Sequence, residues 1–308
     1  MQRSPLPIFV FLLAASAVVT SSSPSEENAP PKSVSIYVAA TSPKGQLVAL
    51  SPADLSIQED KQPTHIDQVE CGKPEPLLLA VLLDTSLGRG TDPFLPAHYD
   101  TLNKFLSSTL AKDDTAYIVT FGGEAKPLTA MTSDARVLAA ALDKLKSTAP
   151  LGKHASYDAV KTASDQNLSV DHVRRVIVMI GNFYDHASKI NISQALAAPL
   201  KSQSTVFFLV DDDARRQQRI IQDTSEDDAL RIARETGGQA FVVNQQNEFP
   251  AALDSIHNVL THSCRVKYTP SFPNETKDLL PLSVKAVRGH VTLFAPQSRP
   301  ATLNAPQP

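Results

Sequence analysis

The sequence has little net charge and only two cysteines, and it lacks long apolar runs beyond its first twenty residues. Its 29 lysines and arginines nearly balance 32 aspartates and glutamates, so the formal net charge is −3. This balance argues against a nucleic-acid-binding protein, which needs a basic surface. Because a transmembrane helix needs ~20 consecutive apolar residues, we also expect no transmembrane segment in the mature chain.

The first residues have the features of a secretory signal. Arg3 supplies a positive charge, residues 8–15 form an apolar core, and Ala-Ser-Ala at 15–17 resembles a cleavage site. The apolar core is too short to span a bilayer, and no cysteine follows it that could carry a lipid. We therefore expect a signal peptide at 1–20, a polar linker at 21–32, and a secreted or periplasmic protein.

The rest of the chain is organised around residues 77–84, an apolar run that ends in Asp84, Thr85 and Ser86. A strand that is apolar on both faces is typical of the centre of a parallel sheet covered by helices. In open α/β sheets, ligands bind at the carboxyl ends of such strands. The polar residues after this strand therefore predict the position of a site.

From this strand onward, short apolar runs alternate with amphipathic stretches, which predicts an α/β domain with a doubly wound, mostly parallel sheet. We expect strands at 77–84, 115–121, 175–180, 205–210 and 239–243, with an edge strand at 125–129. We expect helices at 97–111, 134–146, 156–167, 193–203, 225–235 and 250–262. The α/β domain should thus cover residues 75–262.

Both flanks of this domain alternate with the period of a β-strand, at 33–72 and at 264–295. Each flank holds too few strands to bury a core alone. We therefore expect the two β segments to form one small β-sandwich, with the α/β domain inserted between them. Residues 296–308 are polar and rich in proline, and we expect a disordered tail there.

Several local motifs occur in an order that is typical of one family. They lie at 84–86, 117–121, 155–159, 176–180, 287–289 and 294–296. With these motifs the α/β region resembles a von Willebrand factor type A domain. The whole of 34–296 is similar to the bacterial secreted group called VWFA-related Acidobacterial domain proteins.

The resemblance implies a metal-ion-dependent adhesion site, which holds Mg²⁺ through an Asp-x-Ser-x-Ser motif, a threonine and a second aspartate. Asp84 and Ser86 match this pattern, whereas Gly88, His154 and Asn182 stand at the other three positions. These departures remove one carboxylate and two hydroxyls from the ligands of a cation that prefers oxygen. A histidine nitrogen suits zinc or copper better than magnesium. We therefore expect a degenerate site with no metal and no cofactor.

Two other roles remain open for these residues. If Mg²⁺ or Mn²⁺ does bind, its ligands would be Asp84, Ser86 and Asp185, which lies three residues beyond Asn182. Alternatively, Asp84 and Ser86 form hydrogen bonds that cap the helix expected at 97–111 or its loop.

The leading prediction of function is a non-enzymatic protein-interaction or adhesion-type module with an unknown protein partner. Its binding rim should lie at the carboxyl edge of the sheet, at Thr85, Leu87, Arg89, Tyr184 and Asp185, beside His154. The alternative is a metal-dependent adhesion module with altered ligands. A serine hydrolase is a third possibility, but Ser86 lacks the glycine two residues before it and no oxyanion-hole motif accompanies it.

Cys71 and Cys264 are the two cysteines of the chain, and an oxidising compartment would allow them to pair. Cys71 lies just before the first strand of the α/β domain, at its amino edge. The last helix must return to the same edge, where Cys264 follows it. We therefore expect a disulfide between them; the alternative is two buried free thiols.

Overall fold

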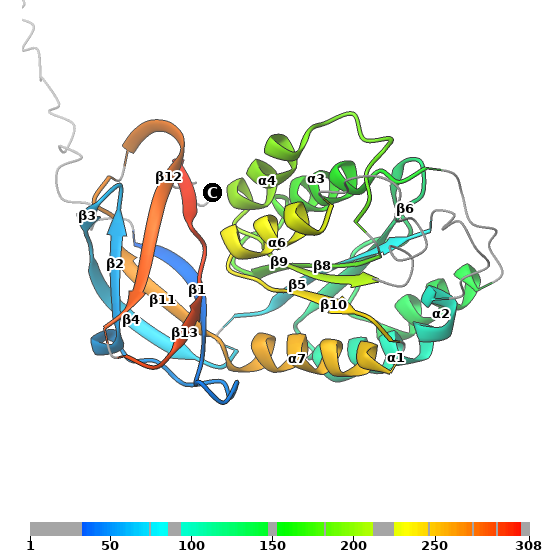
Figure 1. Ribbon diagram of the computed structural model, residues 1–308, viewed down its shortest axis with the longest axis horizontal. Coiled ribbons are helices and arrows are strands. Elements are labelled where there is room, and N and C mark those ends of the chain that lie inside the picture. Colours follow the sequence, from blue (N-terminus) through cyan, green and yellow to red (C-terminus); the bar gives the residue numbers. More distant parts are fainter. Residues whose placement is uncertain are drawn as a thin grey trace, which may run out of the picture. The chain divides into compact units, whose positions relative to one another are not determined.

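The computed structural model describes residues 33–73, 75–85, 94–146, 153–181, 183–211, 225–245, 247–272, 274–287 and 289–302. The expected signal peptide and linker lie outside these ranges. Figure 1 shows a central sheet with helices on both faces and, before and after it in the sequence, strands that form two further sheets. No α-helix of the described ranges combines the length and the apolar character needed to cross a bilayer.

The central sheet has six strands in the order β10-β9-β8-β5-β6-β7. They are β5 (Leu77–Asp84), β6 (Thr115–Phe121), β7 (Ala125–Pro127), β8 (Arg174–Gly181), β9 (Thr205–Asp211) and β10 (Ala240–Val243). All neighbours are parallel except β6 and β7, which are antiparallel. The expected doubly wound, mostly parallel sheet is confirmed.

Helices cover both faces of this sheet (Figure 1). The described helices are α1 (Phe94–Thr109), α2 (Ala135–Leu145), α3 (Ser156–Asn167), α4 (Ile192–Lys201), α6 (Ser225–Glu235) and α7 (Glu248–His262). Alternate residues of β5 belong to two separate cores. Leu79 and Val81 pack in the core with α1, α2 and α7. Ala80 and Leu82 pack in the core with α3, α4 and α6. The continuous apolar run of β5 is thus explained by burial on both faces.

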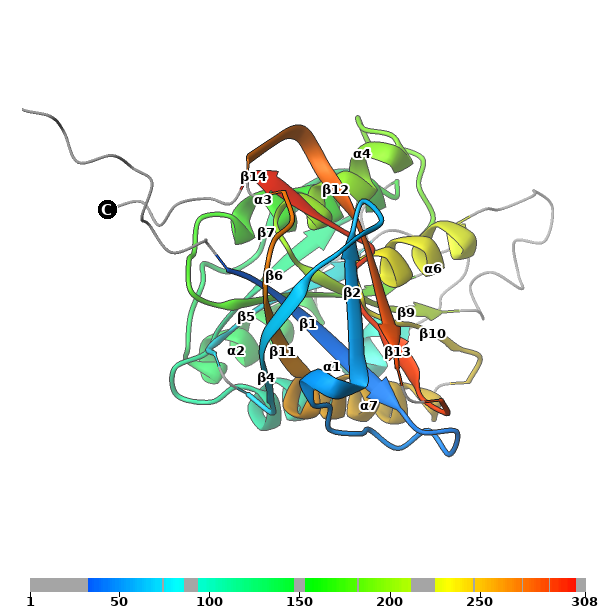
Figure 2. The same ribbon diagram turned by 90° about the vertical axis from the view of Figure 1, so that its left-hand side faces the viewer.

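The flanking segments form two four-stranded sheets, β13-β1-β11-β4 and β14-β12-β2-β3, seen from the side in Figure 1 and face-on in Figure 2. Their strands are β1 (Val34–Thr41), β2 (Leu55–Glu59), β3 (Gln62–Pro63), β4 (His65–Cys71), β11 (Cys264–Thr269), β12 (Asn274–Ala286), β13 (Thr292–Phe294) and β14 (Ser298–Thr302), with a 3-10 turn at Pro52–Asp54. Each sheet contains strands from both flanks. Apolar side chains of both flanks, such as Ile36, Ile57 and Val266, share one core, as the fold prediction required.

The C-terminal segment differs from the expectation of a disordered tail at 296–308. Residues 298–302 form β14, an edge strand paired with β12. Its Arg299 is 1% exposed and donates to Glu59, which is 0% exposed and also accepts a hydrogen bond from the Tyr268 hydroxyl at 2.9 Å. The polar composition of the segment did not indicate a strand, because the charge of Arg299 is neutralised by Glu59 only in the folded sandwich. Residues 303–308 lie outside the described ranges.

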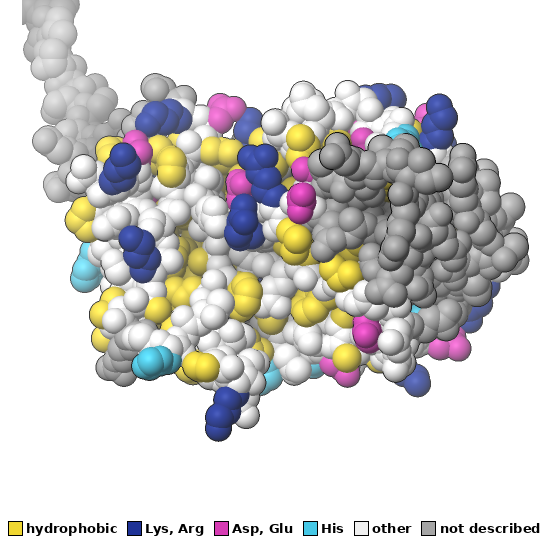
Figure 3. Space-filling model, in the orientation of Figure 1, with side chains coloured by type: hydrophobic (Ala, Val, Ile, Leu, Met, Phe, Trp, Pro, Cys, Tyr) yellow, Lys and Arg dark blue, Asp and Glu magenta, His cyan; other side chains and the backbone are white. Residues whose placement is uncertain are grey.

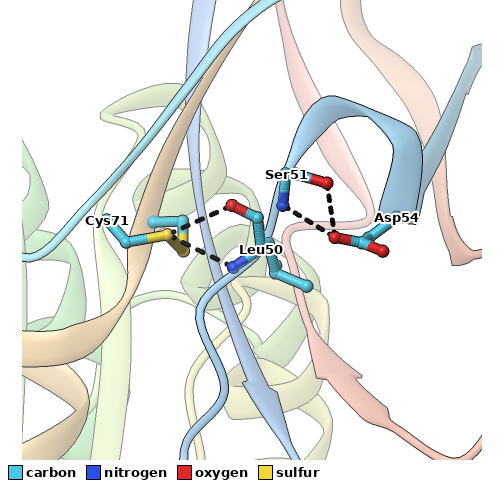
Figure 4. Close-up of a disulfide and its surroundings, with 5 residues drawn as sticks. Leu50, Ser51, Asp54 and Cys71 are labelled. Atoms are coloured by element: carbon cyan, nitrogen blue, oxygen red, sulfur yellow. Dashed lines mark hydrogen bonds between the residues drawn. A yellow bond between two sulfur atoms is a disulfide. The ribbon is translucent and has the colours of Figure 1, made fainter.

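The expected disulfide is present. Cys71 and Cys264 face each other across β4 and β11, with a Cα–Cα distance of 3.8 Å. Figure 4 shows the Leu50 backbone beside the bridge, where its N–H donates to Cys71 Sγ at 3.3 Å. Because Cys71 precedes β5 and Cys264 follows α7, the bond closes both ends of the inserted domain.

Charged side chains of both signs are interspersed over the described part of the face in Figure 3. This face therefore presents no continuous basic surface among the described residues, in keeping with the small net charge.

Removing the disulfide should destabilise the protein strongly. The bond joins residues 193 positions apart, and closing so long a loop in the unfolded chain is worth about 5 kcal/mol in the chain-entropy model. A Cys71→Ser, Cys264→Ser double variant should therefore unfold at much lower guanidinium concentration than the oxidised parent. An unchanged midpoint would contradict a stabilising role for the bridge.

Glu59 should contribute to stability at neutral pH but not in acid. Burial acts to raise its pKa, but hydrogen bonds from Arg299 and Tyr268 outweigh burial and hold the pKa below the ordinary 4.5. The stabilisation is therefore present above that value and is lost as the pH falls through the lower pKa of the folded state. Glu59→Gln should cost about 3 kcal/mol at pH 7, because it leaves Arg299 buried without a carboxylate.

The matched control is Glu124→Gln, since Glu124 forms an exposed ion pair with Lys126 and should contribute less than about 1 kcal/mol. Urea unfolding of both variants from pH 3 to pH 7 provides the measurement. Equal costs for the two variants, or a cost for Glu59→Gln that grows in acid, would count against this role of the buried pair.

Candidate functional site

The carboxyl edge of the central sheet brings Asp84 and His154 together. Asp84 is the last residue of β5, and His154 lies two residues before α3. Asp84 Oδ2 lies 3.3 Å from His154 Nδ1, and each side chain is only 7% exposed. Because water is largely excluded there, the Asp84 carboxylate interacts with the His154 imidazole rather than with solvent.

The neighbouring strand leaves room for Asp84 only because it ends in glycine. A Cβ atom on Gly181 would lie 2.3 Å from Asp84 Cβ and 2.9 Å from its Oδ2. Gly181 also has φ +155°, a conformation that other residues rarely adopt. The Asp84 side chain is therefore packed directly against the backbone of β8.

The first described residue of the loop after β8 has a strained backbone. Phe183 has φ +54°, which is unusual for a bulky side chain and carries a cost of order 1–3 kcal/mol. Its ring packs against the rings of Phe208 and Tyr157, with centroids 4.6 and 5.8 Å away. This buried anchor fixes the direction in which the chain continues to Tyr184.

Asp185 joins this loop to the start of α3. Its Oδ1 accepts hydrogen bonds from the Ser156 N–H at 3.0 Å and from the Ser188 hydroxyl at 2.6 Å. Burial raises the pKa of Asp185, although the hydrogen bonds from Ser188 and from the backbone oppose this effect. The Ser156 hydroxyl in turn donates to the Tyr184 carbonyl at 2.6 Å. Asp185 thus serves the first turn of α3, where an N-terminal acceptor is favourable.

Two rings of this loop form a cluster with His154, which precedes α3. His154 lies edge-on to Tyr184 and to His186, with centroids 5.7 and 6.2 Å apart, and Tyr184 and His186 are 3.9 Å apart. His154 is buried, Tyr184 is half-buried and His186 is exposed. The backbone N–H groups of His186 and Ala187 both donate to the His154 carbonyl at 2.9 Å. The cluster therefore leads from the buried carboxylate to the surface.

The structure brings four of the candidate residues into one site, Asp84, His154, Tyr184 and Asp185. Thr85 follows Asp84, and its N–H donates to the Phe121 carbonyl at 3.2 Å. The other candidates, Ser86, Leu87, Gly88, Arg89 and Asn182, lie outside the described residues. His186 belongs to no motif in the sequence, and its place beside Tyr184 depends on the turn at Phe183, which no local pattern indicates.

Among the described residues, the two candidate carboxylates are engaged by groups of the protein. Asp84 contacts an imidazole, and Asp185 accepts from two donors of the protein, whereas Mg²⁺ requires oxygen ligands that are available to it. Within the described ranges, no group of three or more histidine, cysteine, aspartate or glutamate side chains could hold a metal ion.

Comparisons with known proteins identify the fold. No protein-family model and no curated protein matches the chain. Proximal thread matrix protein 1 from the mussel byssus, in a structure with a zinc-occupied MIDAS motif, is 12% identical with a TM-score of 0.53, over 66% of this chain and 50% of its own. A von Willebrand factor type A protein from Catenulispora acidiphila is 9% identical with a TM-score of 0.50, over 88% of this chain and 74% of its own.

BatB from Bacteroides thetaiotaomicron is 19% identical over 59% of this chain and 98% of its own, with a TM-score of 0.47. The first two similarities establish a von Willebrand A-like fold for the inserted domain. At such low identities they extend to the fold alone.

Replacing Asp185 tests its assignment to the protein scaffold. Asp185→Ala removes the acceptor of the Ser156 N–H and should cost about 1–2 kcal/mol, as does the loss of a helix N-cap. Asp185→Asn keeps an acceptor oxygen and should cost less. Chemical denaturation with and without Mg²⁺ measures both, and a cost that appears only with Mg²⁺ present would instead assign Asp185 to a metal.

Proposed function

We propose that this protein is a secreted or periplasmic, non-enzymatic interaction module of the adhesion type, which binds a protein partner without a divalent metal. The observation that carries the proposal is the contact between Asp84 Oδ2 and His154 Nδ1. In a metal-ion-dependent adhesion site, the carboxylate at this position would serve the cation. Here the imidazole takes that place, so the edge of the sheet is organised by side chains.

The adjoining loop supports a preformed binding rim. Hydrogen bonds through Asp185 and Ser156 join the loop to α3, so Tyr184 and His186 need little ordering when a partner binds. Preorganisation reduces the entropic cost of association, and tyrosine is among the residues enriched at interface hot spots. We include Thr85, Leu87 and Arg89 in the rim from their positions in the sequence.

The presence of a disulfide supports the proposed location. Cys71 and Cys264 are bonded, and disulfides persist mainly in oxidising compartments. The signal-like features of residues 1–20 point to the same compartment.

A serine hydrolase is the second candidate, and one observation favours it. A carboxylate near Nδ1 is also how catalytic triads orient a general-base histidine. Hydrolysis of simple nitrophenyl esters discriminates the two functions. We expect that any ester hydrolysis by the parent protein is unchanged in His154→Ala. Hydrolysis that is lost when either His154 or Ser86 is replaced would favour the hydrolase.

The metal content of the purified mature protein should be zero for divalent cations after gel filtration in Mg²⁺ and Mn²⁺. The reason is the donor set, in which His154 and Gly88 replace hydroxyl ligands and Asn182 replaces a charged carboxylate. Elemental analysis measures this directly. The positive control is the triple variant His154→Thr, Gly88→Ser, Asn182→Asp, which should gain affinity that the single variants lack; one equivalent retained by the parent would contradict the proposal.

Partner binding tests the rim itself. We expect proteins captured from the native extracellular fraction to be retained equally with and without a chelator, because no metal bridges the interface. Tyr184→Ala and His186→Ala should each reduce capture. His290→Ala is the matched control, since His290 is also exposed but lies in the turn before β13. Loss of capture by the chelator would support the metal-dependent alternative.

A further inference from the structure

A cavity of about 160 Å³ lies at the amino edge of the central sheet, opposite the proposed rim. Ser35 and Tyr37 of β1 line one side, and Val173, Arg175 and Thr205, near the starts of β8 and β9, line another. An apolar cavity of ~150 Å³ holds benzene. This cavity is therefore large enough for a small organic molecule.

Beside the cavity lies an arginine that has no ion pair within the described residues. Arg174 stands between two lining residues, Val173 and Arg175, and is 4% exposed. It donates from Nη1 to the Leu260 carbonyl at 2.8 Å and lies 4.5 Å above the Tyr37 ring. Its Nε is buried with no hydrogen-bond partner. Burial lowers the pKa of Arg174 to about 10, although the charge of Glu75 opposes this effect.

Arg175 adds a second positive charge, on the cavity wall. It donates to the carbonyl oxygens of Asn167 at 2.8 Å, Val170 at 2.6 Å and Ser202 at 3.4 Å. Its ion-pair partner within the described residues is Asp171, which is 62% exposed and 3.4 Å away. Such a pair is weak because water screens it.

The carboxylate that lines the cavity is already engaged. Glu75 accepts a hydrogen bond from the Tyr37 hydroxyl at 2.6 Å and pairs with Arg265. Arg265 also pairs with Glu70. Four arginines lie in or beside the cavity. Arg265 and Arg299 have carboxylates in contact, and the charge of Glu75 also acts on Arg174 and Arg175. Among the arginines that line the cavity, Arg175 is therefore the one whose ion-pair partner is exposed to solvent.

Several polar side chains on the wall have unused hydrogen-bonding capacity. Within the described chain, the side chains of Ser35, Thr205 and Gln203 make no hydrogen bond, and all three line the cavity. Gln203 has φ +52° and follows α4, where its N–H donates to the Leu200 carbonyl and the next N–H to the Pro199 carbonyl. Glycine is usual at this position of a helix end. A glutamine there keeps a side chain at the cavity despite the strained backbone.

We propose that this cavity binds a small organic monocarboxylate of about six to nine non-hydrogen atoms. Its carboxylate would face Arg175 and the amide of Gln203, and its apolar body would lie against Val173, Pro199 and Leu200, which also line the cavity. The ligand supplies a shielded negative charge for Arg175, whose own partner Asp171 is exposed. This site is independent of the rim at the other edge.

Three ligands of similar shape test the proposal: benzoate, neutral benzamide and cationic benzylamine. Calorimetry on the full mature chain at low ionic strength should show benzoate binding about tenfold more tightly than benzamide, a difference typical of one charged contact, and no binding of benzylamine. Benzoate should also raise the melting temperature. Equal affinities for the three ligands, or no binding of benzoate, would overturn the proposal.

Two variants locate the site and keep the fold. Gln203→Gly suits the backbone at φ +52°, so it should not lower the melting temperature, yet it should weaken benzoate binding. Asp171→Asn removes the exposed competitor for Arg175 and should strengthen it. Lys201→Ala, in the same helix end but outside the cavity lining, is the matched control and should change nothing. Benzoate affinity that is the same in both variants as in the parent would refute the assignment.

Discussion

The pairing of β4 with β11, closed by the disulfide between Cys71 and Cys264, is the constraint on which the arrangement depends. β4 leads into the first strand of the parallel sheet, and β11 follows its last helix, so the inserted domain leaves and re-enters the sandwich at one point. Just beyond the bridge, Asp114 pairs with Lys73 and accepts the Leu77 N–H at 2.8 Å. The start of the central strand is therefore fixed by groups on both sides of it.

At the opposite end of that strand, contacts within the protein hold Asp84 and the loop after β8. Asp84 is shielded between His154 and the backbone at Gly181. Asp185 and Ser156 join the loop after β8 to α3. Each of these contacts is formed by the chain itself, which is why we infer that the binding rim is complete without a metal.

The sequence was sufficient for the central sheet because burial on both faces leaves a continuous apolar run, as in β5, that few other structures produce. It also indicated the disulfide, since the topology returns the last helix to the edge where Cys71 lies. β14 could not be predicted, because Arg299 makes the segment look polar and its partner Glu59 is 240 residues away. At the site, motif positions predicted Asp84 and His154. The room for Asp84 depends on Gly181 of the neighbouring strand, and the place of His186 depends on the packing of Phe183, both of which are tertiary.

The most direct test of the account is the effect of Mn²⁺ on the imidazole signals of His154 in a ¹⁵N NMR spectrum of the mature protein. Mn²⁺ bound at Asp84 would lie close to this ring, and its unpaired electrons would broaden the signals beyond detection at stoichiometric amounts. The account predicts that the His154 signals persist, no more broadened than those of the exposed His290. Selective loss of the His154 signals at one equivalent of Mn²⁺ would contradict it.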